Sequence, residues 1–328
     1  MRKVAVFGLG LLLGTACGPA PSTTTDPPVT PDRPPPPEPP AVSSAVAPEP
    51  VATATATAVT APPVPTVEPA ASTGAGCPAG MLRIEGATFR MGSDSGEADE
   101  KPVHSVTLAG FCIDAREVTV AEFRRCVDAG KCVAHATAEW RGISEKDQEF
   151  RSQSCNWGQD NRDNHPINCV DWRQSNAYCE WAGKRLPTEE EWEYAARGKD
   201  GRVYPWGDDP PSAARLNGCG AECAAWAKSK GLTWKPMYDG DDGYATTAPV
   251  GSFAAGRSPF GVDDMAGNVA EWTASGYSQD YSRARNNVTR VLRGGSARSE
   301  TPTLVRSSNR HKNIATDRLG GIGFRCAK

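Results

Sequence analysis

The chain has 328 residues and carries 36 basic and 39 acidic side chains, a formal net charge of −3. Neither sign forms a block, so the sequence predicts neither a nucleic-acid-binding surface nor a polybasic membrane-binding surface. About 250 residues follow Cys77, enough to bury one sizeable core, and we expect a single domain there.

Residues 1–16 have the layout of a signal peptide, with two basic residues, an apolar stretch and small residues before Cys17. The apolar stretch is shorter than the roughly 20 residues that span a bilayer, which favours cleavage over a transmembrane anchor. The ending GTAC resembles a bacterial lipoprotein processing site, although Gly14 stands where leucine is usual. We therefore expect lipid on Cys17 and anchoring in the cell envelope, with soluble secretion as the alternative.

Residues 17–76 are predicted to be a disordered linker. Pro, Ala and Thr dominate, as in PPPPEPP and VATATATAVTAPP, and no aromatic residue occurs between Gly18 and Gly76. Such a segment buries too little apolar surface to offset the entropy of ordering, and its prolines favour extended polyproline II conformations. At about 3.1 Å per residue it would hold a domain on the order of 100 Å from a membrane.

Apolar and polar residues alternate in 81–93 and 104–119, which predicts half-buried strands on either side of an acidic loop. A helix follows, because Thr119 and Glu122 form a capping box and Gly130 is placed to end the run. Residues 133–163 are polar and poorly periodic. Beyond the central helices Gly, Pro, Trp and Asp dominate, so we expect short strands, long loops and little regular secondary structure.

Two more helices with start and stop signals follow one another within residues 164–198. Asp171 can cap the first, and Gly183 is placed to end it in a left-handed turn. The second begins at the capping box of residues 188–191, and Trp192 lies on its predicted inward face.

Eleven cysteines behind a secretory signal indicate a disulfide framework, and ten remain if Cys17 carries lipid. A structural zinc site is the alternative, but no spacing gives the paired C-x-x-C arrangement. Sequence alone leaves many connectivities open. The pairs that we favour, mainly because they are local, are Cys126–Cys132, Cys219–Cys223, Cys155–Cys169 and Cys77–Cys112.

Several motifs resemble those of the formylglycine-generating enzyme family, also called sulfatase-modifying factors: HPINCVDW, AYCEWAGKRLPTEEEWEYAARG, FGVDDMAGNVAEW, RGGS and GFRC. The resemblance covers nearly all of residues 77–328. It implies the family's fold, a single irregular α+β domain related to C-type lectins. It also implies a fifth disulfide, Cys179–Cys326, because the cysteines of AYCEW and GFRC are bridged in that family.

The resemblance further implies two structural calcium ions, held in loops rich in the oxygen ligands that calcium prefers. From the residues alone these loops are polar turns more often than metal sites, and their spacing excludes an EF-hand. The implied ligands of the first ion are Asn217, Gly218, Asp242 and Tyr244, and those of the second are Asp264, Gly267, Val269 and Glu271.

Active members of the family carry two cysteines shortly after RGGS, which bind copper(I) and use oxygen to convert a sulfatase cysteine to formylglycine. This chain has no cysteine between Ser296 and Cys326, and a hydroxyl group cannot replace a soft thiolate for copper(I). In addition, Ala270 stands where the family motif has tryptophan. We therefore assign no catalytic residue and expect no copper.

A cleft near this segment is expected, where guanidinium groups can hold a carboxylate or a peptide backbone. Its candidate residues are Arg293, Ser296, Arg298, Arg306 and Arg310, and ion pairing is the alternative role of the arginines. The sequence thus predicts a calcium-stabilised, non-catalytic module that binds a protein or glycan. The alternative is an oxygen-dependent oxidoreductase, of the formylglycine-generating or nonheme iron type, that acts through a divergent site.

Overall fold

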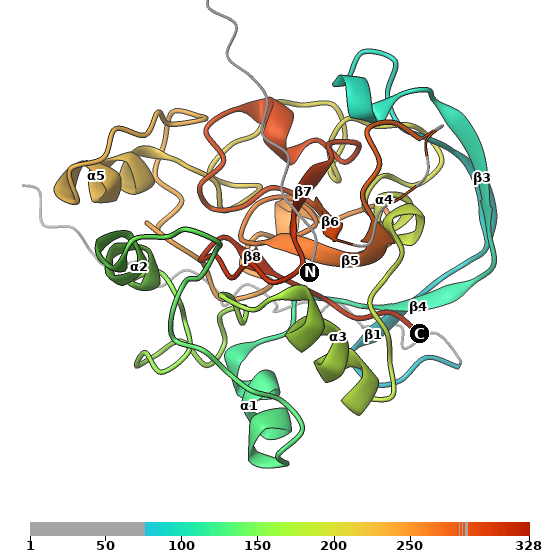
Figure 1. Cartoon of the computed structure of the whole chain (residues 1–328). Coiled ribbons are helices and arrows are strands. Elements are labelled where there is room, and N and C mark those ends of the chain that lie inside the picture. Colours follow the sequence, from blue (N-terminus) through green and yellow to red (C-terminus); the bar gives the residue numbers. More distant parts are fainter. Residues whose placement is uncertain (1–75, 282, 284, 286–287) are drawn as a thin grey trace, which may run out of the picture. The chain divides into compact units, whose positions relative to one another are not determined.

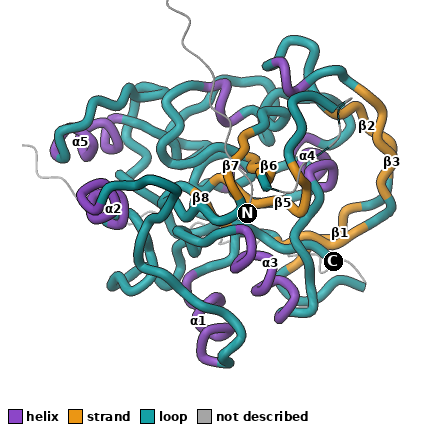
Figure 2. Tube along the Cα trace, viewed as in Figure 1, coloured by secondary structure: helices purple, strands orange, loops and turns teal. Residues whose placement is uncertain are grey.

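The computed structural model describes residues 76–281, 283, 285 and 288–328. The predicted signal peptide, the predicted lipidation site at Cys17 and all but the last residue of the predicted linker lie outside the described residues. In the part that is described, no helix is both long and apolar enough to cross a membrane. Loops connect short helices and strands throughout the domain (Figure 1; Figure 2).

Two antiparallel strand pairs begin the domain: β1 (Met81–Ile84) with β4 (Phe111–Asp114), and β2 (Ala87–Met91) with β3 (His104–Leu108). The β2–β3 pair forms a ribbon along one edge of the domain (Figure 1). The predicted alternation is present, since Phe89 and Met91 of β2 are buried while Thr88 and Arg90 are exposed. This alternation turns one face of the ribbon towards the core.

The centre of the domain is a four-stranded sheet in the order β7-β6-β5-β8. Its strands are β5 (Ala270–Gly276), β6 (Thr289–Arg293), β7 (His311–Ile314) and β8 (Ile322–Gly323). The β5–β6 and β6–β7 pairs are antiparallel, whereas β8 lies parallel to β5. The end of the chain therefore supplies both edge strands of this sheet.

The described residues form five α-helices: α1 (Val120–Asp128), α2 (Glu145–Ser152), α3 (Trp172–Trp181), α4 (Glu189–Arg197) and α5 (Ala221–Ser229). The predicted helices are α1, α3 and α4, and each begins at its predicted cap. The side chains of Thr119, Asp171 and Thr188 each accept a hydrogen bond from the backbone N–H three residues later. We did not predict α2, in the poorly periodic stretch, or α5, which starts at Gly220 without a side-chain cap.

Two apolar clusters hold these elements together. One joins α1, α3 and β5 through Phe123, Tyr178 and Trp272, and the rings of Phe123 and Tyr178 stack with centroids 5.5 Å apart. The other joins α4 to the β2–β3 ribbon through Trp192 and Phe89. Burying one such side chain contributes about 1.5–3 kcal/mol, so these clusters stabilise a fold that has little regular structure.

Five disulfides connect the ten described cysteines, in the pairings that we favoured together with the pairing implied by the family resemblance. Cys179–Cys326 spans 147 residues and ties α3 to the end of the chain. Beyond it, the Cys112 N–H donates to the Lys328 carbonyl at 2.8 Å and the Arg185 N–H donates to the Ala327 carbonyl at 2.9 Å. The last residues are therefore an integral part of the fold.

Candidate functional site

A cavity of about 580 Å³ is bounded by α2, by residues of the central sheet and by the loop that follows β6. Its volume lies within the range of sites that hold small molecules. Part of the wall is apolar and comprises Trp140, Ala270, Leu292, Leu304, Leu319 and Ile322. Its ionic groups include Arg151, Arg298, Lys312 and Asp317.

The cavity lies at the segment after RGGS, where the family resemblance implies the redox cysteines of active members. Ser296, Ser299 and Leu304 line it, together with Ala270. Ser299 is buried, and its hydroxyl oxygen accepts a hydrogen bond from the Ser296 N–H at 3.0 Å. Every cysteine that the structure describes is committed to a disulfide. The described part of the molecule therefore offers no thiolate to a copper(I) ion at this place.

Arg298 extends from the loop after β6 into the cavity wall. Its Nη2 donates a hydrogen bond to the Ser154 hydroxyl, and its guanidinium carbon lies 5.5 Å from the centre of the Trp234 ring. No carboxylate pairs with Arg298 or Arg151 among the residues described. Burial, with a further contribution from the Arg151 charge, lowers the pKa of Arg298 to about 10. The fold thus holds two uncompensated positive charges near one another.

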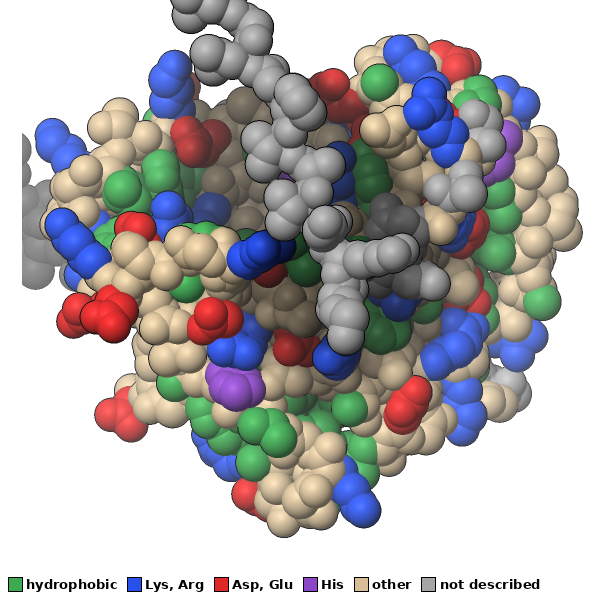
Figure 3. All heavy atoms as spheres, viewed as in Figure 1, with side chains coloured by type: hydrophobic (Ala, Val, Ile, Leu, Met, Phe, Trp, Pro, Cys, Tyr) green, Lys and Arg blue, Asp and Glu red, His purple; other side chains and the backbone are tan. Residues whose placement is uncertain are grey.

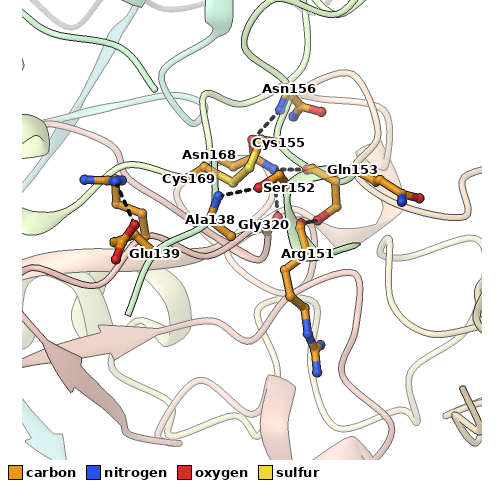
Figure 4. The surroundings of a disulfide bond; sticks show 12 residues. Ala138, Glu139, Arg151, Ser152, Gln153, Cys155, Asn156, Asn168, Cys169 and Gly320 are labelled. Atoms are coloured by element: carbon orange, nitrogen blue, oxygen red, sulfur yellow. Dashed lines mark hydrogen bonds and ion pairs between the residues drawn. A yellow bond between two sulfur atoms is a disulfide. The ribbon is translucent and has the colours of Figure 1, made fainter. Parts of the chain in front are cut away.

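The loop after α2 is fixed from behind by a disulfide and an asparagine (Figure 4). Cys155–Cys169 ties this loop to the segment before α3. Asn168 is fully buried, and its Nδ2 donates to the carbonyls of Ser154 and Gly320, each at 2.7 Å. These contacts place the Ser154 hydroxyl where it accepts the hydrogen bond from the cavity arginine.

Gly320 allows the cavity wall to close around Arg298. A Cβ built at this position would lie 2.1 Å from Ser154 Oγ and 2.9 Å from Arg298 Nη2. Both contacts are too close for a carbon atom. Any side chain at position 320 would therefore force the arginine or the serine to move, and only glycine permits the observed approach.

Two of the five residues predicted for the cleft, Ser296 and Arg298, line this cavity. The prediction is wrong for Arg293, which is fully buried in the core. Its Nη2 donates to Glu193 of α4, and its Nη1 donates to the Ser308 carbonyl at 2.8 Å. The cause is the position of Arg293 at the inner end of β6, against the charged side chains of α4.

Arg306 and Arg310 are also ion-paired and do not line the cavity. Arg310 Nε lies 2.5 Å from Glu189 Oε1, and Arg306 Nη2 lies 2.6 Å from Glu100 Oε1. Arg310 instead borders a separate hollow beside the 98–100 turn. For these arginines the ion-pair alternative holds, because buried carboxylates from distant parts of the chain face them.

The residues implied for the first calcium ion lie close together. The Asn217 Nδ2 is 3.5 Å from Asp242 Oδ1 and 3.3 Å from the Tyr244 carbonyl oxygen, and the Gly218 N–H donates to Asp242 Oδ2 at 3.1 Å. Asn217 Oδ1 is buried without a hydrogen-bond partner among the described residues. Burial raises the pKa of Asp242 to about 6. A buried, unpartnered oxygen beside a carboxylate and a carbonyl is a donor set that suits calcium.

The second implied site contains more carboxylates than basic side chains. Glu117, Asp264 and Glu271 are buried near one another, and Arg325 is the cation among them, with both N–H···O distances to Glu271 at 2.7 Å. Burial, then the charges of Asp264 and Glu271, raise the pKa of Glu117 well above its usual value. Such an excess of negative charge favours a bound cation.

The other two residues implied for the second ion, Gly267 and Val269, lie between Asp264 and Glu271 in the same loop. Gly267 has φ 84°, and a Cβ there would lie 2.2 Å from the Asn217 carbonyl oxygen, so the loops of the two implied sites touch. Across the described ranges, no group of three or more His, Cys, Asp or Glu side chains is arranged to hold a metal ion. Any calcium here would therefore depend on backbone and amide oxygens as well.

Arg151, Ser154 and Lys312 line the cavity or position its arginine, and the sequence did not predict them as site residues. Arg151 and Ser154 come from the stretch that lacks periodicity, and Lys312 comes from an edge strand. The spacing of Cys155 and Cys169 indicated that a disulfide holds this loop in place. It did not indicate which part of the domain the loop faces.

Comparison with known proteins gives consistent matches over the described domain. The family described as sulfatase-modifying factor enzyme 1-like domain matches residues 67–328, starting before the predicted boundary at residue 77. A formylglycine-generating enzyme of Streptomyces coelicolor is 34% identical over 292 residues, covering 76% of this chain and 88% of that protein. An inactive C-alpha-formylglycine-generating enzyme 2 of Bos taurus is also 34% identical, covering 75% and 87% respectively.

Among solved structures, PvdO from Pseudomonas aeruginosa superposes with a TM-score of 0.58 at 29% sequence identity. The match covers 75% of this chain and 93% of that structure. The fold is therefore shared along almost the whole length of that protein.

Proposed function

Because this chain belongs to the sulfatase-modifying factor enzyme 1-like domain family, we propose that its cavity is a binding site that replaces the catalytic centre of active members. The described domain has the single-domain, mixed α and β fold of formylglycine-generating enzymes. The observation that supports non-catalytic binding is the cavity itself, lined by Ser296, Ser299 and Leu304 and without a free thiol among the described residues.

The chemistry of formylglycine formation supports this proposal. Oxidation of a cysteine by oxygen needs a metal ion that changes oxidation state, and copper(I) prefers thiolates. Serine and leucine do not supply such a ligand, and bridged cysteines do not titrate. A relative of similar identity whose name describes it as inactive shows that the family accommodates members without this activity.

An activity assay tests this proposal. The purified full-length protein, given copper(I), oxygen, a reductant and a Cys-x-Pro-x-Arg peptide, should form no aldehyde above a metal-free control. The Streptomyces coelicolor relative serves as the positive control. Formylglycine detected by mass spectrometry, or stoichiometric iron or copper retained after mild chelation, would instead support the oxidoreductase alternative.

We further propose that two calcium ions stabilise the domain. The unpartnered Asn217 oxygen supports the first site, and the excess of buried carboxylates around Asp264 supports the second. These ions would neutralise carboxylates and fix the loops, and they would take no part in a redox step.

The proposed setting is the bacterial cell envelope, with the domain tethered through lipid on Cys17 and the proline-rich linker. The GTAC ending supports this location. Mass spectrometry of the mature N-terminus should find an acylated cysteine at position 17. An unmodified N-terminus elsewhere would show a soluble exported protein and would leave the proposal for the cavity unchanged.

A further inference from the structure

We infer that the cavity binds a carboxylate carried on an apolar body, and that Arg298 and Arg151 hold the carboxylate. This inference rests on the proposed function, since it names a ligand class for the same cavity. It follows from three features of the structure: uncompensated charge, free hydrogen-bond donors and an apolar wall.

The charge of the cavity is unbalanced. Its lining includes the cationic side chains of Arg151, Arg298 and Lys312, and the carboxyl group of Asp317. Lys312 lies 4.3 Å from the centre of the Tyr277 ring, a cation–π contact that stabilises the ammonium group and leaves its charge in place. Asp317 is buried, and among the described residues it forms no ion pair with either arginine. The two arginines therefore have no carboxylate partner in the described structure, and a bound anion would relieve their repulsion.

Arg298 is oriented before any ligand arrives. A guanidinium group has five N–H donors in a rigid fork. Among the described residues, the Ser154 hydroxyl is the acceptor for the guanidinium group of Arg298, and the Trp234 ring lies beside the guanidinium carbon. The remaining N–H groups are available to a planar carboxylate, which arginine binds in a bidentate manner. Because Asn168 and Gly320 fix the serine, little conformational entropy is lost when the ligand binds.

The apolar wall indicates what the carboxylate is attached to. Ala270, Leu292, Leu304 and Ile322 line the cavity, and nothing in this wall favours a second charged group. Next to the two arginines, the rings of Phe150, Trp226 and Trp234 form a row between α2 and α5, with centroids 6.4 Å and 5.6 Å apart. α2 and α5 lie on the same side of the domain (Figure 1). An apolar group fits the wall, and further atoms of the ligand can pass over this aromatic row.

On the face shown in Figure 3, basic and acidic side chains are interspersed. General attraction of anions by that face is therefore not the basis of the inference. The feature that would select a carboxylate on an apolar body is local: two arginines lie against an apolar wall. Selectivity for one carboxylate over polyanions is the expected consequence.

Isothermal titration calorimetry on the purified full-length protein tests the inference. The probes are the peptide acetyl-Gly-Ser-Gly-Leu-Phe with a free carboxylate, the same peptide as its carboxamide, and 4-phenylbutyrate. The free-acid peptide or 4-phenylbutyrate should bind, and the carboxamide should bind at least tenfold more weakly than the free-acid peptide. Tighter binding of the peptide would identify a chain terminus as the ligand, and equal or tighter binding of 4-phenylbutyrate would identify a free carboxylic acid.

The variants Arg298→Gln and Arg151→Gln should each weaken binding of the better probe at least tenfold. Arg125→Gln is the matched control, because Arg125 lies on α1 with its side chain 70% exposed, and binding should change less than twofold. Circular dichroism establishes that each variant is folded. If a variant fails to fold, the comparison of free acid with carboxamide on the unmodified protein still decides.

Two results would overturn the inference: equal binding of the free-acid peptide and its carboxamide, or no binding of either carboxylate at millimolar concentration. The formylglycine assay separates this outcome from failure of the proposed function. Absence of both aldehyde and carboxylate binding would overturn the ligand class alone. Aldehyde formation together with carboxylate binding would overturn the non-catalytic proposal alone.

Discussion

The buried charges under α4 and the charges of the cavity are arranged in opposite ways. Under α4, Arg293 meets Glu193, and Arg310 meets Glu189, with all four side chains fully buried. In the cavity, Arg298 is partly buried and meets a serine hydroxyl in place of a carboxylate. The fold therefore supplies a partner for each core arginine of these pairs but leaves the cavity arginine with unused donors.

This difference distinguishes structural arginines from binding arginines in one domain. A buried ion pair costs desolvation energy that only good geometry repays, so neither partner can be removed cheaply. An unpaired cation at a cavity costs stability in the free protein and gains it back when a ligand binds. Distance from RGGS in the sequence does not distinguish structural arginines from binding arginines. The groups that each arginine contacts in the fold do distinguish them.

The largest loss of stability is expected when a charge is removed from the ion pairs in the core. Glu193→Gln should lower the free energy of unfolding by about 3–5 kcal/mol, because Arg293 and Arg197 would lose their shared carboxylate. Urea denaturation measures the change. Glu190→Gln is the control on the same helix, since Glu190 is 21% exposed and pairs with Arg285, and it should cost less than about 1 kcal/mol. Equal effects of the two variants would contradict the structural role of the core pairs.

Arg162 is a further cation without a carboxylate partner in the described structure, and its neighbour His165 makes stability depend on pH. Its Nη1 lies 3.0 Å from His165 Nδ1, and burial together with the Arg162 charge lowers the pKa of His165 to about 4. The unfolded chain takes up this proton near pH 6.5, so the free energy of unfolding should fall between pH 6.5 and 4, by up to about 3 kcal/mol, and level off below. His165→Gln should flatten this part of the profile, and a profile that keeps its slope would refute the assignment.

The proposed calcium sites arrange their charges in a third way. Carboxylates there outnumber basic side chains, and the proposed partner of the carboxylates is a metal ion. Calcium at 100 times its dissociation constant should raise the free energy of unfolding by about 2.7 kcal/mol per site. Thermal unfolding in calcium, in chelator and in magnesium at the same concentration measures this. Asp264→Asn should remove the effect of the second site and leave that of the first. A melting temperature that is the same in calcium and chelator would rule out both sites.

The smallest stability effect is expected at the cavity wall. Gly320→Ala should displace Arg298 or Ser154 and lower the free energy of unfolding by about 1–3 kcal/mol, because a well-packed contact is overfilled. Gly320→Ala should also weaken carboxylate binding at least tenfold, as Arg298→Gln should. Gly142→Ala is the control, since a Cβ there has no atom within 4 Å, although its positive φ of 85° adds local strain. Binding unchanged in Gly320→Ala would show that the arginine is not held as described.

Local signals in the sequence predicted local structure well. The capping boxes at Thr119 and Thr188 and the cap at Asp171 mark helix starts because the cap and its partner lie within four residues. α5 was not predictable in this way, since Gly220 provides no side-chain cap. The polar composition of α2 hid its helical character, because none of its residues is buried.

The site was less predictable, because its contacts join distant segments. Arg293 and Glu193 are 100 residues apart, and Arg298 and Ser154 are 144 apart, so neither pairing leaves a periodic trace. The sequence did indicate where the cavity lies, through RGGS and the missing cysteines. It did not indicate which arginine faces the cavity, since that depends on where each carboxylate is placed by the fold.

The contacts of residues 325–328 have a consequence for the order of folding. Until this segment is in place, Cys179 has no disulfide partner and Glu271 lacks the cation of Arg325. The edge of β4 is likewise unpaired at Cys112, which bonds to Lys328 in both directions. The capped helices can form early, because their contacts are local, whereas the domain closes only when residues 325–328 dock. The docking of this distant segment, and not the formation of the helices, is therefore expected to limit the rate at which the domain folds.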